Sequence, residues 1–309
     1  MAASFDSVSH EWLIRFLEHR TPGLDPGADK RILRLIQKWL RAGVWEDGRI
    51  EVPERGTGQG AAISPLLAPG ECFAFPSIYL HYVLDLWAER WRRREARGDM
   101  VIVRYADDAI FGFESETDAR RFLDAMRERL AAFALTLHPD KTRLIEFGRL
   151  AAANREKRGL GKPETFKFLG FTFICGKSRK GGFALKRKSR GDRMRAKLKE
   201  IKEGLRKRMH DPLARQGKWL GQVVQGWFNY HAVPTNFRAL GAFRFNVVDL
   251  WRRSLRRRSQ KDVTTWDRIE SRARESLPLP KILHPWPSER FRVKHPRWEP
   301  YAGIPPVRI

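Results

Sequence analysis

The chain has 309 residues, of which 42% are hydrophobic, so it is long enough to bury one core and a second beside it. Its net charge of +25 is confined to one half. Residues 1–150 contain 22 Lys and Arg against 23 Asp and Glu, whereas residues 151–309 contain 39 against 13. A half-chain with this excess of positive charge needs a polyanion to neutralise it, and nucleic acid is the usual partner of that kind.

An anionic membrane surface is the main alternative partner. However, no apolar run approaches the roughly 20 residues that span a bilayer, and Met1 is followed by AASFDSVSH rather than by a signal peptide. We therefore expect a soluble, cytoplasmic protein without a membrane partner. The two cysteines, Cys72 and Cys175, have no CxxC or CxxxH neighbour, which excludes a zinc ribbon or a four-Cys zinc site.

The first element that the pattern predicts clearly is a hairpin. The apolar run 101–103 is interrupted by Asp107 and Asp108 and resumes over residues 109–113, which is typical of two strands joined by a polar turn. Clusters of Gly, Pro and charged residues mark the breaks of the chain. They lie at residues 21–29, 55–60, 69–76, 149–163 and 176–182.

An amphipathic helix follows this hairpin. Ser115 is its expected N-cap, Asp118 occupies the capping-box position, and apolar residues then recur at helical spacing over 119–137. Four phenylalanines around Leu169-Gly170 next predict a second hairpin over residues 166–173 that ends in the Gly-rich turn 176–182.

Three helical stripes follow Ser189, over residues 194–209, 220–231 and 237–255, and they imply a small bundle. A single basic helix face is ordinarily only solvated, but two successive basic faces in a half-chain with 13 acidic residues indicate RNA binding. The predicted RNA-binding residues are Lys197, Lys199, Lys202, Arg206, Lys207, Arg256 and Arg257. After Leu277 the many prolines predict an extended tail.

Two adjacent carboxylates at the tip of a hairpin have two interpretations. Asp is common in turns, because it tolerates turn geometry and hydrogen-bonds to its own backbone. Carboxylates held between two strands also present oxygen ligands that suit a hard cation such as Mg²⁺. Two such ions can activate a primer 3′ hydroxyl and hold the departing pyrophosphate in nucleotidyl transfer. Under the second interpretation, Asp107 and Asp108 are metal ligands of a polymerase centre.

Ordered sequence blocks decide between these interpretations. IVRYADDAIFGF is followed by LTLHPDKTRLIEFG, FKFLGFTF and GQVVQGWFNYHAVPTN. In this order they resemble the YADD block, the two blocks after it and the maturase-specific thumb, domain X, of reverse transcriptases encoded by group II introns. Upstream, FDSVSHEWLIRFLEHR resembles the block after the family's first catalytic aspartate, and GTGQGAAISPLLA resembles the block with the nucleotide-contacting glutamine. The resemblance covers nearly the whole chain and implies a prokaryotic host.

The resemblance also implies roles for single residues. Asp107 would ligate the metal ions, and Asp108 would assist or orient. Phe5 would be the steric gate that favours dNTPs, and Gln59 would contact the incoming nucleotide. The other implied residues are Tyr105 and Ala106 beside the nucleotide, Lys141 near the pyrophosphate, and Phe168, Leu169, Gly170 and Phe171 in the primer grip. The plainer alternatives are a core aromatic for Phe5, a turn residue for Gln59, a surface charge for Lys141 and an ordinary hairpin core for FLGF.

The chain departs from the family pattern in three respects. The first metal-binding aspartate lies six residues before the position of Asp6 in that pattern, upstream of Met1, and the fingers are also missing, so we expect an N-terminally truncated chain. PGECFAFPS intervenes after Ala68, and Gly58 replaces a proline. No His-Asn-His cluster follows the thumb, so we do not expect target-site cleavage.

The expected fold is α+β. A right-hand polymerase palm, an antiparallel sheet backed by helices, would span residues 1–178. A three-helix thumb, domain X, would span 179–260, and a basic Pro-rich tail 261–309. The expected cofactor is Mg²⁺, and the expected partners are group II intron RNA, an RNA template with a DNA primer, dNTPs and a second copy of the chain in a homodimer.

Three functional hypotheses remain open at this point. The first is an RNA-directed DNA polymerase that is catalytic as the full-length protein. The second is a maturase remnant that only binds intron RNA. The third is an unrelated basic RNA-binding protein with a chance YADD, which the ordered blocks argue against.

Overall fold

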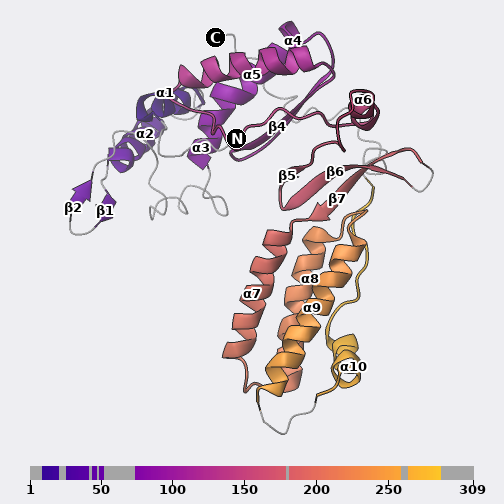
Figure 1. Ribbon diagram of the computed structural model, residues 1–309. Coiled ribbons are helices and arrows are strands. Elements are labelled where there is room, and N and C mark those ends of the chain that lie inside the picture. The colour runs from indigo at the N-terminus through magenta and orange to yellow at the C-terminus, as the bar shows by residue number, and fades with distance from the viewer. Residues whose placement is uncertain are drawn as a thin grey trace. The chain divides into compact units, whose positions relative to one another are not determined.

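The computed structural model describes residues 9–20, 26–41, 44–46, 49–51, 74–178, 181–258 and 264–286 of the chain. The chain divides into two compact units, Met1–Ile145 and Glu146–Ile309 (Figure 1). None of the described helices is long and apolar enough to cross a membrane.

The first unit combines helices with two short antiparallel hairpins. One hairpin pairs β1 with β2, and the other pairs β3 with β4. The elements are α1 (His10–Arg20), α2 (Pro26–Arg41), β1 (Val44–Glu46), β2 (Arg49–Glu51), α3 (Ala74–Leu80), the π-helix η2 (His81–Asp85), α4 (Leu86–Arg94), β3 (Met100–Tyr105), β4 (Asp108–Phe113) and α5 (Glu116–Ala131). The predicted hairpin over residues 101–113 is thus confirmed as β3–β4. The stretch PGECFAFPS, which interrupts the family pattern after Ala68, includes the first turn of α3.

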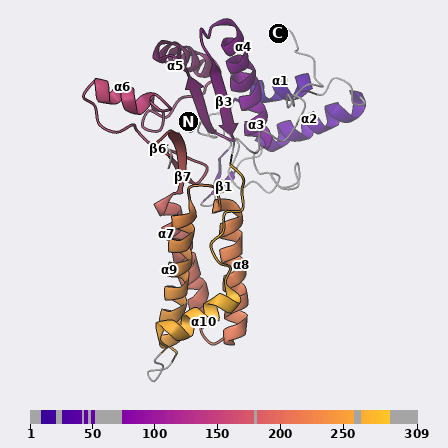
Figure 2. The ribbon, with the colours of Figure 1, turned by 90° about the vertical axis from the view of Figure 1, so that its right-hand side faces the viewer.

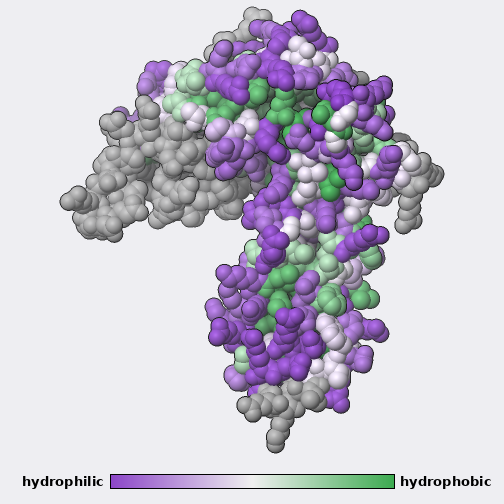
Figure 3. Space-filling view, in the orientation of Figure 1, coloured by the Kyte–Doolittle hydropathy of each residue, from purple (hydrophilic) through white to green (hydrophobic). Residues whose placement is uncertain are grey.

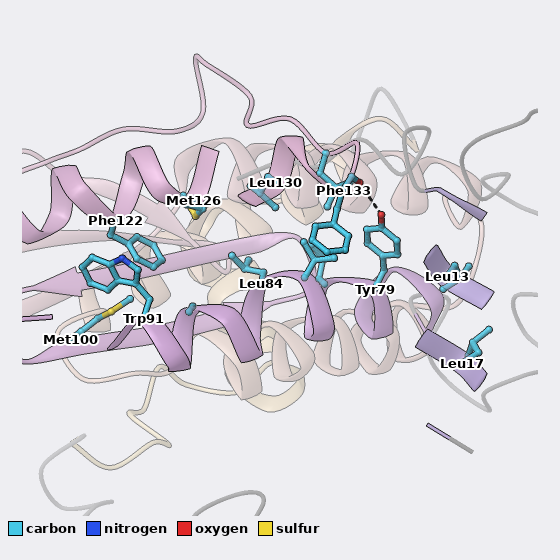
Figure 4. Close-up of a cluster of buried hydrophobic side chains, with 14 of the residues drawn as sticks. Leu13, Leu17, Tyr79, Leu84, Trp91, Met100, Phe122, Met126, Leu130 and Phe133 are labelled. Carbon is cyan, nitrogen blue, oxygen red and sulfur yellow. Dashed lines mark hydrogen bonds between the residues drawn. The ribbon is translucent and has the colours of Figure 1, made fainter. Parts of the chain in front are cut away.

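The core of this unit lies between the β3–β4 hairpin and the helices α4 and α5. The ring of Phe122, on α5, packs against Phe111 and Phe113 of β4 at centroid distances of 4.8 and 5.3 Å. Figure 4 shows the cluster continuing to Tyr79, whose hydroxyl donates to the Phe133 carbonyl at 2.8 Å. Burial raises the pKa of Tyr79 to about 12. One face of the hairpin is therefore fixed against helices.

The start of α5 differs in one detail from the sequence prediction. Ser115 is the N-cap, as expected, and its hydroxyl accepts from the amide of Thr117. Asp118 is buried but does not complete a capping box; its carboxylate accepts from the amide of Arg97 at 2.8 Å. The hydrogen bond from the Arg97 amide is the main reason that the pKa of Asp118 is lowered. This residue ties the loop before β3 to α5.

The second unit is a three-stranded antiparallel sheet followed by a helical bundle (Figure 2). Its elements are α6 (Ala151–Lys157), β5 (Phe166–Phe168), β6 (Phe171–Lys177), β7 (Phe183–Ser189), α7 (Gly191–Lys207), α8 (Leu213–His231), α9 (Phe237–Arg256) and α10 (Trp266–Ser276). The second predicted hairpin and the three predicted helices are all present. Strands β5 and β6 lie in this unit, although residues 1–178 were predicted to form the palm domain, and β7 lies in the range predicted for the thumb. The domain boundaries themselves stay a prediction.

Three elements of this unit were not predicted, and one of them, α6, lies in the stretch 149–163 that was predicted to be a break of the chain. Strand β7 pairs with the whole of β6, although its sequence FALKRKS has too few alternating apolar residues to indicate a strand. Helix α10 lies in the stretch assigned to the tail, so the bundle has at least a fourth helix. Its narrow apolar stripe of Ile269, Ala273 and Leu277 is fully part of the helical core.

Close packing in the bundle depends on small residues and one buried amide. A Cβ at Gly204 of α7 would lie 2.6 Å from the Trp219 ring, and a Cβ at Gly221 of α8 would lie 2.4 Å from the Ser276 carbonyl oxygen. The side chain of Gln216 accepts from the Trp251 indole N–H at 2.9 Å and donates to the Arg208 carbonyl at 2.6 Å, so it joins three parts of the bundle.

Candidate active site

The predicted catalytic pair lies at the turn of the β3–β4 hairpin. Strand β3 ends at Tyr105 and strand β4 begins at Asp108, which is its direct partner, so Ala106 and Asp107 form a two-residue turn. Ala106 has a φ of 52°, a left-handed conformation that costs a residue with a Cβ about 1 kcal/mol. This strained turn places Asp107 at the tip.

The two faces of this hairpin have different surroundings. Residues directly paired across antiparallel strands share a face, so Tyr105 and Asp108 lie on the face that also carries Val101 and Val103. The exposed fractions are 59% for Val101, 43% for Val103 and 65% for Tyr105. Within the described part of the chain this face is open, whereas the opposite face packs on α4 and α5.

The donor set at this turn fits a divalent cation. Among the described residues, neither carboxylate of Asp107 and Asp108 is engaged in a hydrogen bond or ion pair, so their oxygens are available to a ligand. Mg²⁺ usually binds one or two carboxylates together with water and substrate phosphates, rather than a full cage of protein ligands. The described residues contain no group of three or more His, Cys, Asp or Glu side chains that could hold a metal ion.

Arg104 holds the turn from the packed side of the hairpin. Its Nη1 donates to the carbonyl of Ala106 at 2.7 Å. Its Nε and Nη2 donate to the two carboxylate oxygens of Asp85 at 2.6 and 2.5 Å. A bidentate pair of this kind fixes both distance and plane, so Asp85 orients the guanidinium that fixes the strained turn.

Asp85 is the last residue of the π-helix η2. Burial alone would raise its pKa, but hydrogen bonds from His81 and Arg104 and the charge of Arg104 outweigh burial and lower the pKa below its ordinary value. Short π-helical turns leave carbonyls without their usual partner and are frequent near functional sites. Here the carbonyl of Val83 accepts from Arg129 Nε of α5 at 3.1 Å. Hydrogen bonds thus connect α5 to η2 through Arg129, and η2 to the Ala106 turn through Asp85 and Arg104.

The predicted primer-grip residues form the turn between β5 and β6, in the second unit. Leu169 and Gly170 both have positive φ, 43° and 75°, between the directly paired Phe168 and Phe171. Both turn carbonyls are bound: that of Leu169 accepts from the Tyr230 hydroxyl at 2.9 Å, and that of Gly170 accepts from the Arg190 amide at 3.0 Å. The four residues are therefore brought together in one rigid turn.

A buried polar cluster lies where β7 meets the end of α8. Asn236 Nδ2 donates to Ser189 Oγ at 2.7 Å, and this hydroxyl lies 3.0 Å from His231 Nδ1. Because Ser189 Oγ already accepts, its own hydrogen can go to Nδ1, which then belongs to a neutral imidazole. Burial lowers the pKa of His231 to about 4. The cluster joins the sheet to the bundle, and the His231 and Phe171 rings also pack together with their centroids 5.1 Å apart.

The structure gathers part of the predicted RNA-binding set. Arg258 donates to the carbonyls of Met209 and Asp211, which places the ends of α7 and α9 side by side. Exposed basic residues at this end of the bundle are Arg206, Lys207, Arg256 and Arg257. Lys199 and Lys202 lie further back along α7 and are also exposed, while Lys197 pairs with Glu200 at 2.7 Å. Figure 3 shows hydrophilic side chains over much of the surface of this unit.

Three further predicted site residues are Lys141, Phe5 and Gln59. Lys141 is exposed in a turn of the first unit that is closed by the Thr142 amide and the His138 carbonyl, 3.0 Å apart. Phe5 and Gln59 lie outside the described residues, so their predicted roles stay predictions.

Four residues of these sites were not predicted from the sequence: Arg104, Asp85, Tyr230 and His231. The sequence does contain a signal for Arg104. Every second residue of β3 lies on the packed face, so Arg104 follows Met100 and Ile102 on that face. A charge at such a position requires a partner. Its partner is 19 residues away, and nothing in the local pattern indicates it.

Comparisons with known proteins show the family of this chain. The family model for the reverse transcriptase (RNA-dependent DNA polymerase) matches residues 1–173. The chain therefore belongs to the reverse transcriptase family, whose members use divalent metal ions. It is also 28% identical over 149 residues, 48% of this chain, to the "Uncharacterized 91 kDa protein in cob intron" of Schizosaccharomyces pombe, and it spans 17% of that protein's length.

Proposed function

We propose that this chain is part of a group II intron-encoded reverse transcriptase, which extends a DNA primer on an RNA template and binds intron RNA during splicing. The observation that carries the proposal is the β3–β4 turn, because it presents two carboxylates that no other described residue binds, on a hairpin fixed from behind by Arg104. Membership of the reverse transcriptase family supports RNA-directed DNA synthesis as the reaction. The word "intron" in the name of the Schizosaccharomyces pombe relative supports an intron origin.

In this proposal Asp107 and Asp108 hold Mg²⁺. When bound, such ions supply activation of the primer 3′ hydroxyl and stabilisation of the leaving pyrophosphate. The protein's own contribution is positional: Arg104 limits movement of the turn, so the Asp107 carboxylate needs little reorganisation when substrate binds. Tyr105 presents an exposed ring beside Asp108, on the face where a nucleotide or primer would lie. Lys141 is the proposed partner of the pyrophosphate.

The maturase remnant is a second candidate function. The basic end of the bundle favours it, since Arg206, Lys207, Arg256 and Arg257 gather there independently of the YADD turn. Such a surface would bind RNA through phosphates and would need no synthesis.

The two candidates are separated by one pair of assays. The first measures extension of a labelled DNA primer on an RNA template with dNTPs and Mg²⁺, and the second measures protein-dependent splicing of a group II intron RNA at limiting Mg²⁺. Extension that requires the RNA template supports the polymerase. Splicing activity without extension supports the remnant, and failure of both assays contradicts the proposal.

A further inference from the structure

The sheet of the second unit has one face that carries only lysines and small or uncharged residues. Lys167 of β5 is paired with Thr172 of β6, and Thr172 is paired with Lys188 of β7. Directly paired residues share a face, so these three residues form a row across the sheet. Ile174 and Lys186 form the next pair on the same face. Lys167, Lys186 and Lys188 together form what we term the lysine face.

The opposite face of the sheet forms part of the core. Phe168 and Phe171 are buried there, and the ring of Phe171 stacks on Tyr230 of α8 at 5.7 Å. Phe166 and Phe173 stack on each other at 4.8 Å on the same side. Because successive strand residues alternate between faces, the lysine face points away from this aromatic layer. All three lysines are exposed.

No negative charge balances the lysine face from within the sheet. The paired residues on this face are Lys167, Thr172, Ile174, Gly176, Ala184, Lys186 and Lys188, and none is acidic. Within the described ranges, none of the three ammonium groups forms an ion pair with a carboxylate. The region therefore presents three unneutralised charges at fixed strand positions.

Gly176 leaves room for one of these lysines. A Cβ at residue 176 would lie 2.6 Å from Cδ and Cε of Lys186, so the aliphatic chain of Lys186 lies directly across the glycine. The absence of a side chain at this position lets Lys186 lie against the sheet.

The spacing of the lysines suits a nucleic-acid backbone. Residues two apart on a strand are separated by about 7 Å, and positions two strands apart by about 10 Å. Phosphates follow one another at roughly 3.4 Å of axial rise along each strand of a duplex, so the three lysines can contact different phosphates of one backbone. Like charges on neighbouring strand positions destabilise a sheet, and a bound polyanion would remove this repulsion.

We propose that the lysine face binds backbone phosphates of a nucleic acid, as a binding surface separate from the basic helix faces. The inference rests on the proposed function, since it requires a chain that handles RNA or an RNA–DNA hybrid. Contacts of this type do not read sequence; they hold the strand and make binding depend on salt.

The test compares two triple variants of equal charge. The first is Lys167→Gln with Lys186→Gln and Lys188→Gln. The matched control changes exposed lysines of the same unit outside this face: Lys157→Gln, Lys162→Gln and Lys177→Gln. Fluorescence anisotropy measures binding of a labelled RNA–DNA hybrid and of single-stranded RNA over a series of KCl concentrations, and circular dichroism checks that both variants fold as the wild type does.

The lysine-face variant should bind on the order of 100-fold more weakly at about 0.15 M salt, and its log–log salt slope should fall by about 3. The control should change much less. If the lysine-face variant loses affinity for the hybrid alone, the ligand of this face is a duplex. If it loses affinity for both probes, a single strand is enough for binding. Equal binding by the two variants overturns the inference and leaves the proposed function standing, whereas failure of the wild type to bind either probe overturns both.

Discussion

The contribution of the Arg104 hydrogen bonds to the stability of the YADD turn can be measured by replacing Arg104. Replacing Arg104 by Leu removes three charge-assisted hydrogen bonds and leaves the Asp85 carboxylate without its bidentate partner. The exposed fractions are 15% for the Arg104 side chain and 28% for that of Asp85. Fully buried pairs lose about 3–5 kcal/mol when one partner is removed, and exposed pairs about 0–1 kcal/mol. A loss of about 2 kcal/mol follows for this partly buried pair.

The assay is urea unfolding of the wild type, Arg104→Leu, Asp85→Asn and the double variant. The double-mutant cycle should give a coupling energy of about 1–2 kcal/mol. Arg120→Leu is the matched control, because its ion pair with Glu116 is exposed, and it should cost less than about 0.5 kcal/mol. Additive effects of Arg104→Leu and Asp85→Asn would refute the proposed support of the turn.

Three further predictions concern the second unit. The neutral, buried His231 should make stability depend on pH: its folded pKa of about 4 lies below the unfolded value of 6.5, so the unfolded state binds more protons between these values, and about 3 kcal/mol should be lost as pH falls from 6.5 to 4. The urea midpoint of the wild type should fall over this range, and a drop of the same size in His231→Phe would contradict the assignment. Gly170→Ala places a Cβ at a φ of 75° and should cost about 1 kcal/mol in urea unfolding, so an unchanged midpoint would show that the turn relaxes freely. Gly221→Ala, whose Cβ would lie 2.4 Å from the Ser276 carbonyl oxygen, should cost about 2 kcal/mol and expose α10 to protease, whereas wild-type protection would contradict this packing.

Local patterns predicted the elements that carry the candidate site. The β3–β4 hairpin was predictable because apolar runs flank Asp107-Asp108, and α5 because Ser115 caps a regular apolar stripe. Each signal lies within a single hairpin or a single capped helix, where sequence periodicity and turn chemistry act directly. The FLGF turn was found for the same reason.

The contacts that fix these turns depend on distant parts of the chain. Asp85 and Arg104 are 19 residues apart, and Tyr230 is 61 residues from Leu169. Strand β7 is stabilised by pairing along β6 rather than by its own pattern, since apolar residues occupy only its first three positions. Tertiary context overrides local propensity in strands of this kind, so such elements are visible only in the folded chain.

The most direct test of the central claim is the rate of single-nucleotide incorporation by Asp107→Asn. This substitution keeps the size of the side chain and removes the negative charge that the proposal assigns to metal binding. The matched control is Asp140→Asn, an exposed turn residue of the same unit. On an RNA template with a DNA primer and Mg²⁺, the Asp107→Asn rate should fall on the order of 10³-fold or more, with the control close to the wild type. A wild-type rate in Asp107→Asn, or no RNA-templated product from the wild type, would contradict the assignment of this turn as a polymerase centre.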